Sequence, residues 1–149
     1  MKDEKKIKLF LVDDDALFLK SLEIEFKGDK DFTDADYSVE TYATGELCLE
    51  NLSHNPDVII LDYQLDGIDK KAMNGLETLT KIKGFNKDIP VVMLSSQDKI
   101  EVAINCMHHK AFDYVVKSET AFVRLQKIIK TIFLYKKMEK ELSWYMDRM

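Results

Sequence analysis

The chain has 149 residues, of which 46% are hydrophobic and 33% charged, and these proportions predict one globular domain with a sizeable core. Its 22 basic and 27 acidic residues give a net charge of −5, which argues against direct nucleic-acid binding because phosphate contacts need clustered lysine and arginine. No apolar run is long enough to span a bilayer, and two cysteines do not suggest a disulfide framework. We therefore expect a cytoplasmic protein that does not bind membranes.

Apolar stretches rich in β-branched residues alternate with helical patterns along the chain. The expected strands are residues 7–12, 37–43, 58–61, 91–94 and 114–116. The expected helices are residues 16–26, 46–52, 74–83, 99–109 and a long one that begins near residue 120. Strands that alternate with helices predict a parallel sheet covered on both faces, in a doubly wound α/β fold. The functional site of such a sheet lies at the carboxyl ends of its strands.

Polar side chains follow four of the five expected strands at the point where each strand ends. They are Asp13, Asp14 and Asp15 after the first strand, Asp62 after the third, Ser95 and Ser96 after the fourth, and Lys117 after the fifth. Carboxylates from two adjacent strands form an oxygen-rich site suited to Mg²⁺. A hydroxyl and an ammonium beside them can hold the oxygens of a phosphoryl group. The pattern therefore predicts phosphoryl transfer, in which positioning and charge neutralisation do most of the work.

These residues stand in four segments that resemble the receiver domain of two-component response regulators. The segments are LVDDD at 11–15, VIILD at 58–62, PVVMLSS at 90–96 and AFDYVVK at 111–117. The resemblance extends over about residues 7–132. It implies a flavodoxin-like, five-stranded parallel sheet with the strand order 2-1-3-4-5. It also implies a phosphoprotein that acts in signal transduction and not as an enzyme, beyond self-catalysed phosphoryl transfer and slow autodephosphorylation.

The resemblance implies a role for each site residue. Asp62 is the phosphoacceptor, Asp13, Asp14, Asp62 and the backbone carbonyl of Gln64 hold Mg²⁺, Ser95 and Tyr114 form the switch, and Lys117 pairs with a phosphoryl oxygen. Asp14 is the direct metal ligand of the acidic pair. The phosphoryl donor is expected to be a sensor histidine kinase or a histidine phosphotransfer protein. Asp15, in contrast, is interpreted as an acid in the first turn of the helix that follows.

Two segments depart from the family pattern. An insertion of roughly five residues follows Asp62, on the rim of the site where loops tolerate extra length. It adds Asp66 and Asp69, which we interpret as solvated loop acids. Ser118 stands where a proline in a cis peptide usually follows the lysine. Because a non-proline cis bond costs about 2.5–4 kcal/mol, we expect a trans bond between Lys117 and Ser118.

The last helix is expected to continue beyond the domain. We assign residues 1–132 to the receiver domain and residues 133–149 to a helical extension that acts as a coiled coil or a linker. Its apolar stripe repeats at alternating intervals of three and four residues and consists of Tyr135, Met138, Leu142, Tyr145 and Met149. This spacing is typical of a coiled coil. The stripe therefore predicts a homodimer through the C-terminal helix, contact with the rest of a longer protein, or packing on the domain itself.

Two other functions are compatible with parts of the pattern. A haloacid-dehalogenase-like phosphatase also uses Asp, Ser, Lys and Mg²⁺, but Leu17 stands where its motif expects Thr or Val, and no acidic pair follows Lys117. A cap domain of that family would not fit in 149 residues. A receiver that serves only as a phosphorylation-independent docking module is the second alternative. The complete set of acids, serine and lysine argues against it.

Overall fold

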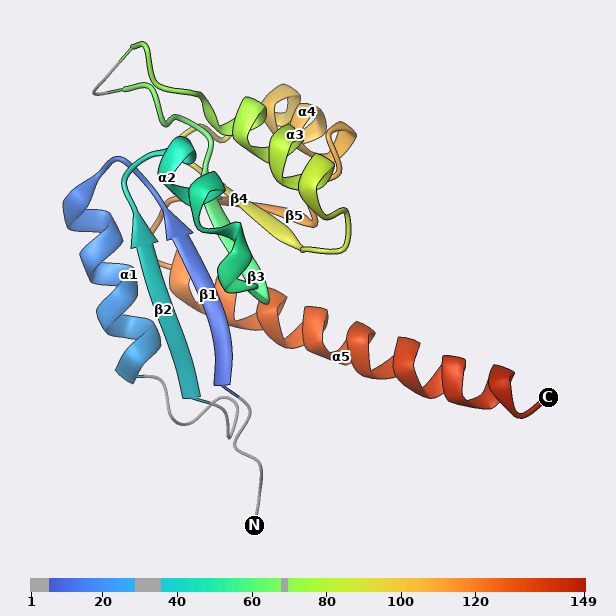
Figure 1. Ribbon diagram of the computed structural model, residues 1–149. Coiled ribbons are helices and arrows are strands. Elements are labelled where there is room, and N and C mark those ends of the chain that lie inside the picture. The colour runs from blue at the N-terminus through green and yellow to red at the C-terminus, as the bar shows by residue number, and fades with distance from the viewer. Residues whose placement is uncertain (1–5, 29–35, 68–69) are drawn as a thin grey trace.

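The computed structural model describes residues 6–28, 36–67 and 70–149. The strands are β1 (Lys6–Val12), β2 (Asp36–Tyr42), β3 (Val58–Asp62), β4 (Val91–Ser95) and β5 (Asp113–Val116). The helices are α1 (Ala16–Gly28), α2 (Gly45–Glu50), α3 (Gly75–Phe85), α4 (Ile100–His108) and α5 (Ala121–Asp147), with a 3₁₀ turn, η1 (Leu52–His54), after α2. All the strands are parallel and their order is β2-β1-β3-β4-β5 (Figure 1). The predicted doubly wound fold is confirmed.

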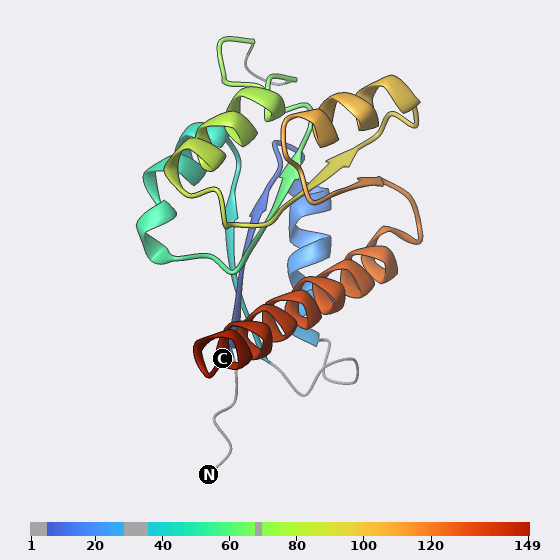
Figure 2. The same cartoon turned by 90° about the vertical axis from the view of Figure 1, so that its right-hand side faces the viewer.

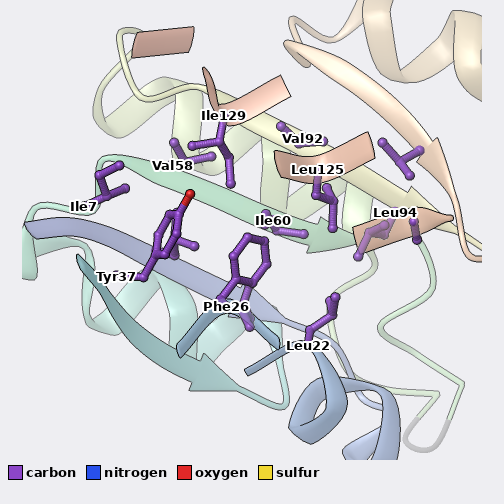
Figure 3. Packing of buried hydrophobic residues seen from close by; sticks show 14 of the residues in the cluster. Ile7, Leu22, Phe26, Tyr37, Val58, Ile60, Val92, Leu94, Leu125 and Ile129 are labelled. Atoms are coloured by element: carbon purple, nitrogen blue, oxygen red, sulfur yellow. The ribbon is translucent and has the colours of Figure 1, made fainter. Parts of the chain in front are cut away.

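Alternation along the strands divides the core into two layers. In β3, Val58 and Ile60 face one cluster of buried residues, whereas Ile59 and Leu61 face the other, as the two-residue period of a strand requires. Helices α1 and α5 cover the first cluster, which Figure 3 shows around Phe26. Helices α2, α3 and α4 cover the second. Because both faces are covered, β3 and β4 are apolar up to their last residues, Asp62 and Ser95.

In the order β2-β1-β3-β4-β5, the chain adds strands on one side of β1 first and then on the other side. The topological switch point of the sheet therefore lies between β1 and β3. Val12 pairs with Leu61, so the residues that follow them on the two strands emerge side by side. On the next pair, Leu94 of β4 lies beside Asp62. The carboxyl ends of β1, β3 and β4 therefore converge at one edge of the sheet, which is where a ligand site is expected in this fold.

Side-chain caps begin three helices close to this edge. Asp15 Oδ1 accepts hydrogen bonds from the backbone N–H groups of Leu17 and Phe18, at 3.1 and 3.2 Å. Thr44 caps α2 and Asn74 caps α3 in the same way. Such caps satisfy N–H groups that have no partner inside the helix. The interpretation of Asp15 as a helix-end acid is confirmed, and it separates this residue from its two acidic neighbours.

Helix α5 begins on the sheet and continues well past it, as Figures 1 and 2 show. Its buried residues are Ala121, Leu125, Ile129 and Ile132. From Leu134 onward its large apolar side chains are exposed. The helix shows no break at residue 132, so the division into domain and extension stays a prediction. None of the described helices combines the length and the apolar character that a membrane span needs.

Candidate functional site

Three carboxylates meet where β1 and β3 end. Asp13, Asp14 and Asp62 each offer an oxygen within 4.8 Å of the others. Asp13 and Asp62 are buried, and Asp14 Oδ2 is a buried oxygen with no hydrogen-bond partner among the described residues. Crowded carboxylates repel one another unless a cation or a proton compensates them. Hard oxygen ligands and an unpaired buried oxygen fit a divalent cation such as Mg²⁺.

Lys117 extends from the end of β5 into this cluster. Its Nζ lies 2.8 Å from Asp13 Oδ2 and 3.5 Å from Asp62 Oδ1. The peptide bond between Lys117 and Ser118 is trans, as predicted. An ammonium on a long side chain reaches both carboxylates without a proline after it. The structure therefore brings together four of the residues that the sequence singled out.

Burial and the neighbouring charges shift the pKa values of Asp62 and Lys117. Burial, together with the charge of Asp13, raises the pKa of Asp62 to about 8, although Lys117 and the N–H of Gln64 act in the opposite direction. Burial alone would lower the pKa of Lys117, but its hydrogen bond to Asp13 and the charges of Asp62 and Asp13 raise it instead. A divalent cation would compensate the carboxylates in place of the proton.

Ser95 and Tyr114, the predicted switch residues, both contact the backbone of Gln97. Ser95 is buried, and its Oγ accepts a hydrogen bond of 3.0 Å from the N–H of Gln97. The hydroxyl of Tyr114 donates to the carbonyl oxygen of Gln97. Burial raises the pKa of Tyr114, while a hydrogen bond with Ser95 opposes this shift. The loop between β4 and α4 is thus held by both side chains, and their role as a switch stays a prediction.

The loop after Asp62 covers one side of the cluster. The N–H of Gln64 donates to Asp62 Oδ1 at 3.3 Å, and its predicted role through the carbonyl remains untested. Gly67 lies close to Asp14, since a Cβ there would be 3.2 Å from Asp14 Oδ2. Asp66 is not among the clustered acids of the described residues, and Asp69 lies outside the part of the chain that the structure describes.

Phe18 is a neighbour of the site that the sequence did not single out. The Nζ of Lys117 lies 4.7 Å from the centroid of its ring, within the range of a cation–π interaction. Three neighbouring apolar residues in α1 make Phe18 look like an ordinary packing residue. No local pattern identifies it, because the contact joins residues at opposite ends of the domain sequence.

The chain matches a known family over most of its length. A model described as "Response regulator receiver domain" matches residues 9–130. The chain is 32% identical over 123 residues to the protein-glutamate methylesterase/protein-glutamine glutaminase of Clostridium acetobutylicum, covering 78% of this chain and 32% of that protein. The corresponding protein of Bacillus subtilis is 34% identical over 117 residues, covering 74% and 29%. The chain spans about a third of the length of these relatives.

Solved structures support the same fold. NtrX from Brucella abortus superposes with a TM-score of 0.77 at 24% identity, covering 97% of this chain and 31% of that one. A CheY-like receiver domain protein from Methanospirillum hungatei gives a TM-score of 0.70 at 23% identity, covering 90% and 99%. With the acid cluster and the family match over residues 9–130, the chain belongs to the receiver domains of two-component response regulators.

Proposed function

We propose that Asp62 accepts a phosphoryl group in a Mg²⁺-dependent reaction and that its phosphorylation switches an output surface. The observation that carries this proposal is the cluster of three carboxylates within 4.8 Å of one another, with the ammonium of Lys117 beside two of them. Asp13, Asp14, Asp62 and the carbonyl of Gln64 would hold Mg²⁺. When bound, the ion neutralises charge on the phosphoryl oxygens.

The residues divide the work of the transfer. A carboxylate oxygen of Asp62 attacks the phosphorus, forming an O–P bond while the P–N bond of a phosphohistidine donor breaks. Lys117 contributes positive charge to a phosphoryl oxygen. Ser95 releases the backbone N–H of Gln97 and donates its hydroxyl to another phosphoryl oxygen. Tyr114 then responds to the new position of Ser95, which transmits the change to the β4–α4 loop.

The partners follow from the family. A sensor histidine kinase or a histidine phosphotransfer protein would supply the phosphoryl group, in the cytoplasm. The methylesterase and glutaminase activities named for the relatives are theirs, since this chain matches only about a third of each. We propose a regulator whose own chemistry is limited to phosphoryl transfer and slow autodephosphorylation. The phosphatase alternative is not favoured, because the receiver family covers residues 9–130.

We further propose that residues 133–149 form a helical extension through which two copies of the chain pair. The stripe of Tyr135, Met138, Leu142 and Tyr145 supports this, because each of these side chains is between 52% and 63% exposed. Apolar side chains repeated at coiled-coil spacing are buried most economically by a second helix of the same kind.

Mass spectrometry after incubation with acetyl phosphate and Mg²⁺ tests the proposed reaction. One phosphoryl group should be added to the wild-type chain and none to Asp62→Asn. EDTA should prevent labelling, and Asp14→Ala should greatly weaken the response to Mg²⁺. Labelling that persists in Asp62→Asn or in EDTA would contradict the mechanism. A folded wild type that takes up no phosphoryl group would instead favour a docking module that works without phosphorylation.

A further inference from the structure

We propose that Phe18 is a positioning residue for Lys117, holding its ammonium at the phosphoryl site through a cation–π contact. This role rests on the proposed phosphorylation of Asp62. The ammonium lies 4.7 Å from the ring centroid of Phe18, while its Nζ also contacts Asp13 and Asp62. The side chain of Lys117 is only 18% exposed, and a cation–π contact gains strength when the charge is removed from water.

The position of Phe18 is itself tied to the acid cluster. Asp15 Oδ1 accepts the backbone N–H of Phe18 at 3.2 Å. The N–H of Asp15 in turn donates to Asp13 Oδ1 at 2.9 Å, and Asp13 is the carboxylate that pairs most closely with Lys117. The ring packs against the core cluster under α1 and α5. A closed set of contacts therefore links Asp13, the start of α1, the aromatic ring and the ammonium.

The contact with Phe18 can hold the ammonium of Lys117 in place before and after phosphoryl transfer. A lysine side chain has four flexible carbons, so fixing its ammonium costs conformational entropy. Its ion pair with Asp62 changes when that carboxylate becomes phosphorylated. The contact with Phe18 involves no group that reacts, so it can persist before and after transfer. The ring then keeps the ammonium at the site while its anionic partner changes from a carboxylate to a phosphoryl oxygen.

A double-mutant cycle tests whether Phe18 acts through Lys117. The rate of Asp62 phosphorylation by acetyl phosphate is measured in Mg²⁺ for the wild type, Phe18→Leu, Lys117→Ala and the double variant. Phe18→Leu should slow the reaction about three- to tenfold in the wild-type background. It should change the rate less than about twofold in the Lys117→Ala background. Phe18→Tyr, which keeps the aromatic face, should stay within about twofold of the wild type.

Three controls separate positioning from folding. The Mg²⁺ dissociation constant, measured by calorimetry, should be unchanged in Phe18→Leu, because the side chain of Phe18 has no oxygen that could bind the ion. Thermal melts identify any unfolded variant, and Phe18→Met repeats the test with another apolar side chain. Equal losses in both backgrounds, or no loss in Phe18→Leu and Phe18→Met, would overturn this role alone. A wild type that is not phosphorylated would overturn the proposed function and this role together.

Discussion

Three consecutive aspartates at the end of β1 have three different environments. Asp13 is buried, pairs with Lys117 and accepts the N–H of Asp15. Asp14 presents a buried oxygen without a hydrogen-bond partner in the described structure. Asp15 is exposed and caps α1. Side chains of identical chemistry thus become an ion-pair partner, a candidate metal ligand and a helix cap, according to where the backbone turns.

Protonation of Asp62 predicts a pH dependence of stability in the metal-free protein. Burial and Asp13 raise its pKa from 3.8 to about 8 in the folded state, so the folded chain keeps a proton that the unfolded chain releases. The unfolded state then binds fewer protons, and the free energy of unfolding should fall by up to about 1.4 kcal/mol per pH unit as pH rises between about 4 and 8.

Asp62→Asn isolates this contribution because its side chain does not titrate. Urea unfolding in EDTA at pH 5.0 to 8.5 gives the free energy of unfolding of both proteins. The predicted quantity is the difference between the two free energies at each pH. The stability of the wild type relative to Asp62→Asn should decrease with rising pH. A difference that stays constant across this range would show that Asp62 is ionised in the folded protein at all these pH values.

Among the secondary-structure elements, helix α3 packs directly against the chain that follows Asp62. The N–H of Gly75 donates to the carbonyl oxygen of Tyr63 at 3.1 Å, and Asn74 caps the helix. The N–H of Met73 donates to the carboxylate of Glu46 on α2, at 3.2 and 3.3 Å. The far end of the inserted loop is therefore attached to α2 and α3.

Two glycines of α3 give a matched pair of substitutions. A Cβ at Gly75 would collide with the carbonyl oxygen of Asp62 and lie 2.7 Å from Tyr63 Cα. Gly75→Ala should therefore destabilise the protein by about 1–3 kcal/mol. Gly84 has no atom within 4 Å of its Cβ position, so Gly84→Ala should stabilise by up to about 1 kcal/mol through helix propensity. Chemical denaturation measures both, and similar effects of the two changes would refute the packing argument.

The whole molecule is a three-layered domain, with the sheet between two layers of helices, from which one helix extends. Helix α5 serves both parts, since its first turns bury Leu125 and Ile129 against the sheet while its later turns expose an apolar stripe. The free cysteines, Cys48 and Cys106, are both buried, and burial raises their pKa values to about 12 and 11. They therefore behave as core thiols, whereas the large apolar side chains of α5 from Leu134 onward are exposed.

We predict that the whole molecule self-associates through helix α5. At high concentration, light scattering should give a dimer for the full chain and a monomer for a chain that ends at Phe133. Leu142→Lys should also give a monomer, because it places a charge in the apolar stripe. Ser143→Lys adds the same charge one residue away, outside the stripe, and should remain a dimer. Monomers in all four cases would refute pairing through α5.

The sequence by itself determined the elements and the edge of the sheet where the site lies. Apolar runs such as residues 58–61 and 91–94 predict buried strands because burial on both faces leaves no polar position. Asp62 and Ser95 can be identified in the same way, because each directly follows such a run. Local errors were small: the helix expected over residues 46–52 is α2 followed by the 3₁₀ turn η1. Hydrophobic pattern and chain order are local properties, so they can be read without coordinates.

Only the tertiary structure decided which side chains meet. Three features of the site have no signature in the sequence. They are the contact of Phe18 with Lys117, the hydrogen bonds of Ser95 and Tyr114 to the backbone of Gln97, and the unpaired oxygen of Asp14. Each depends on side-chain packing between elements that are distant along the chain or on the burial of single atoms. Periodicity assigns a residue to a face of its own helix or strand, but the neighbour it meets is determined by how the elements pack together.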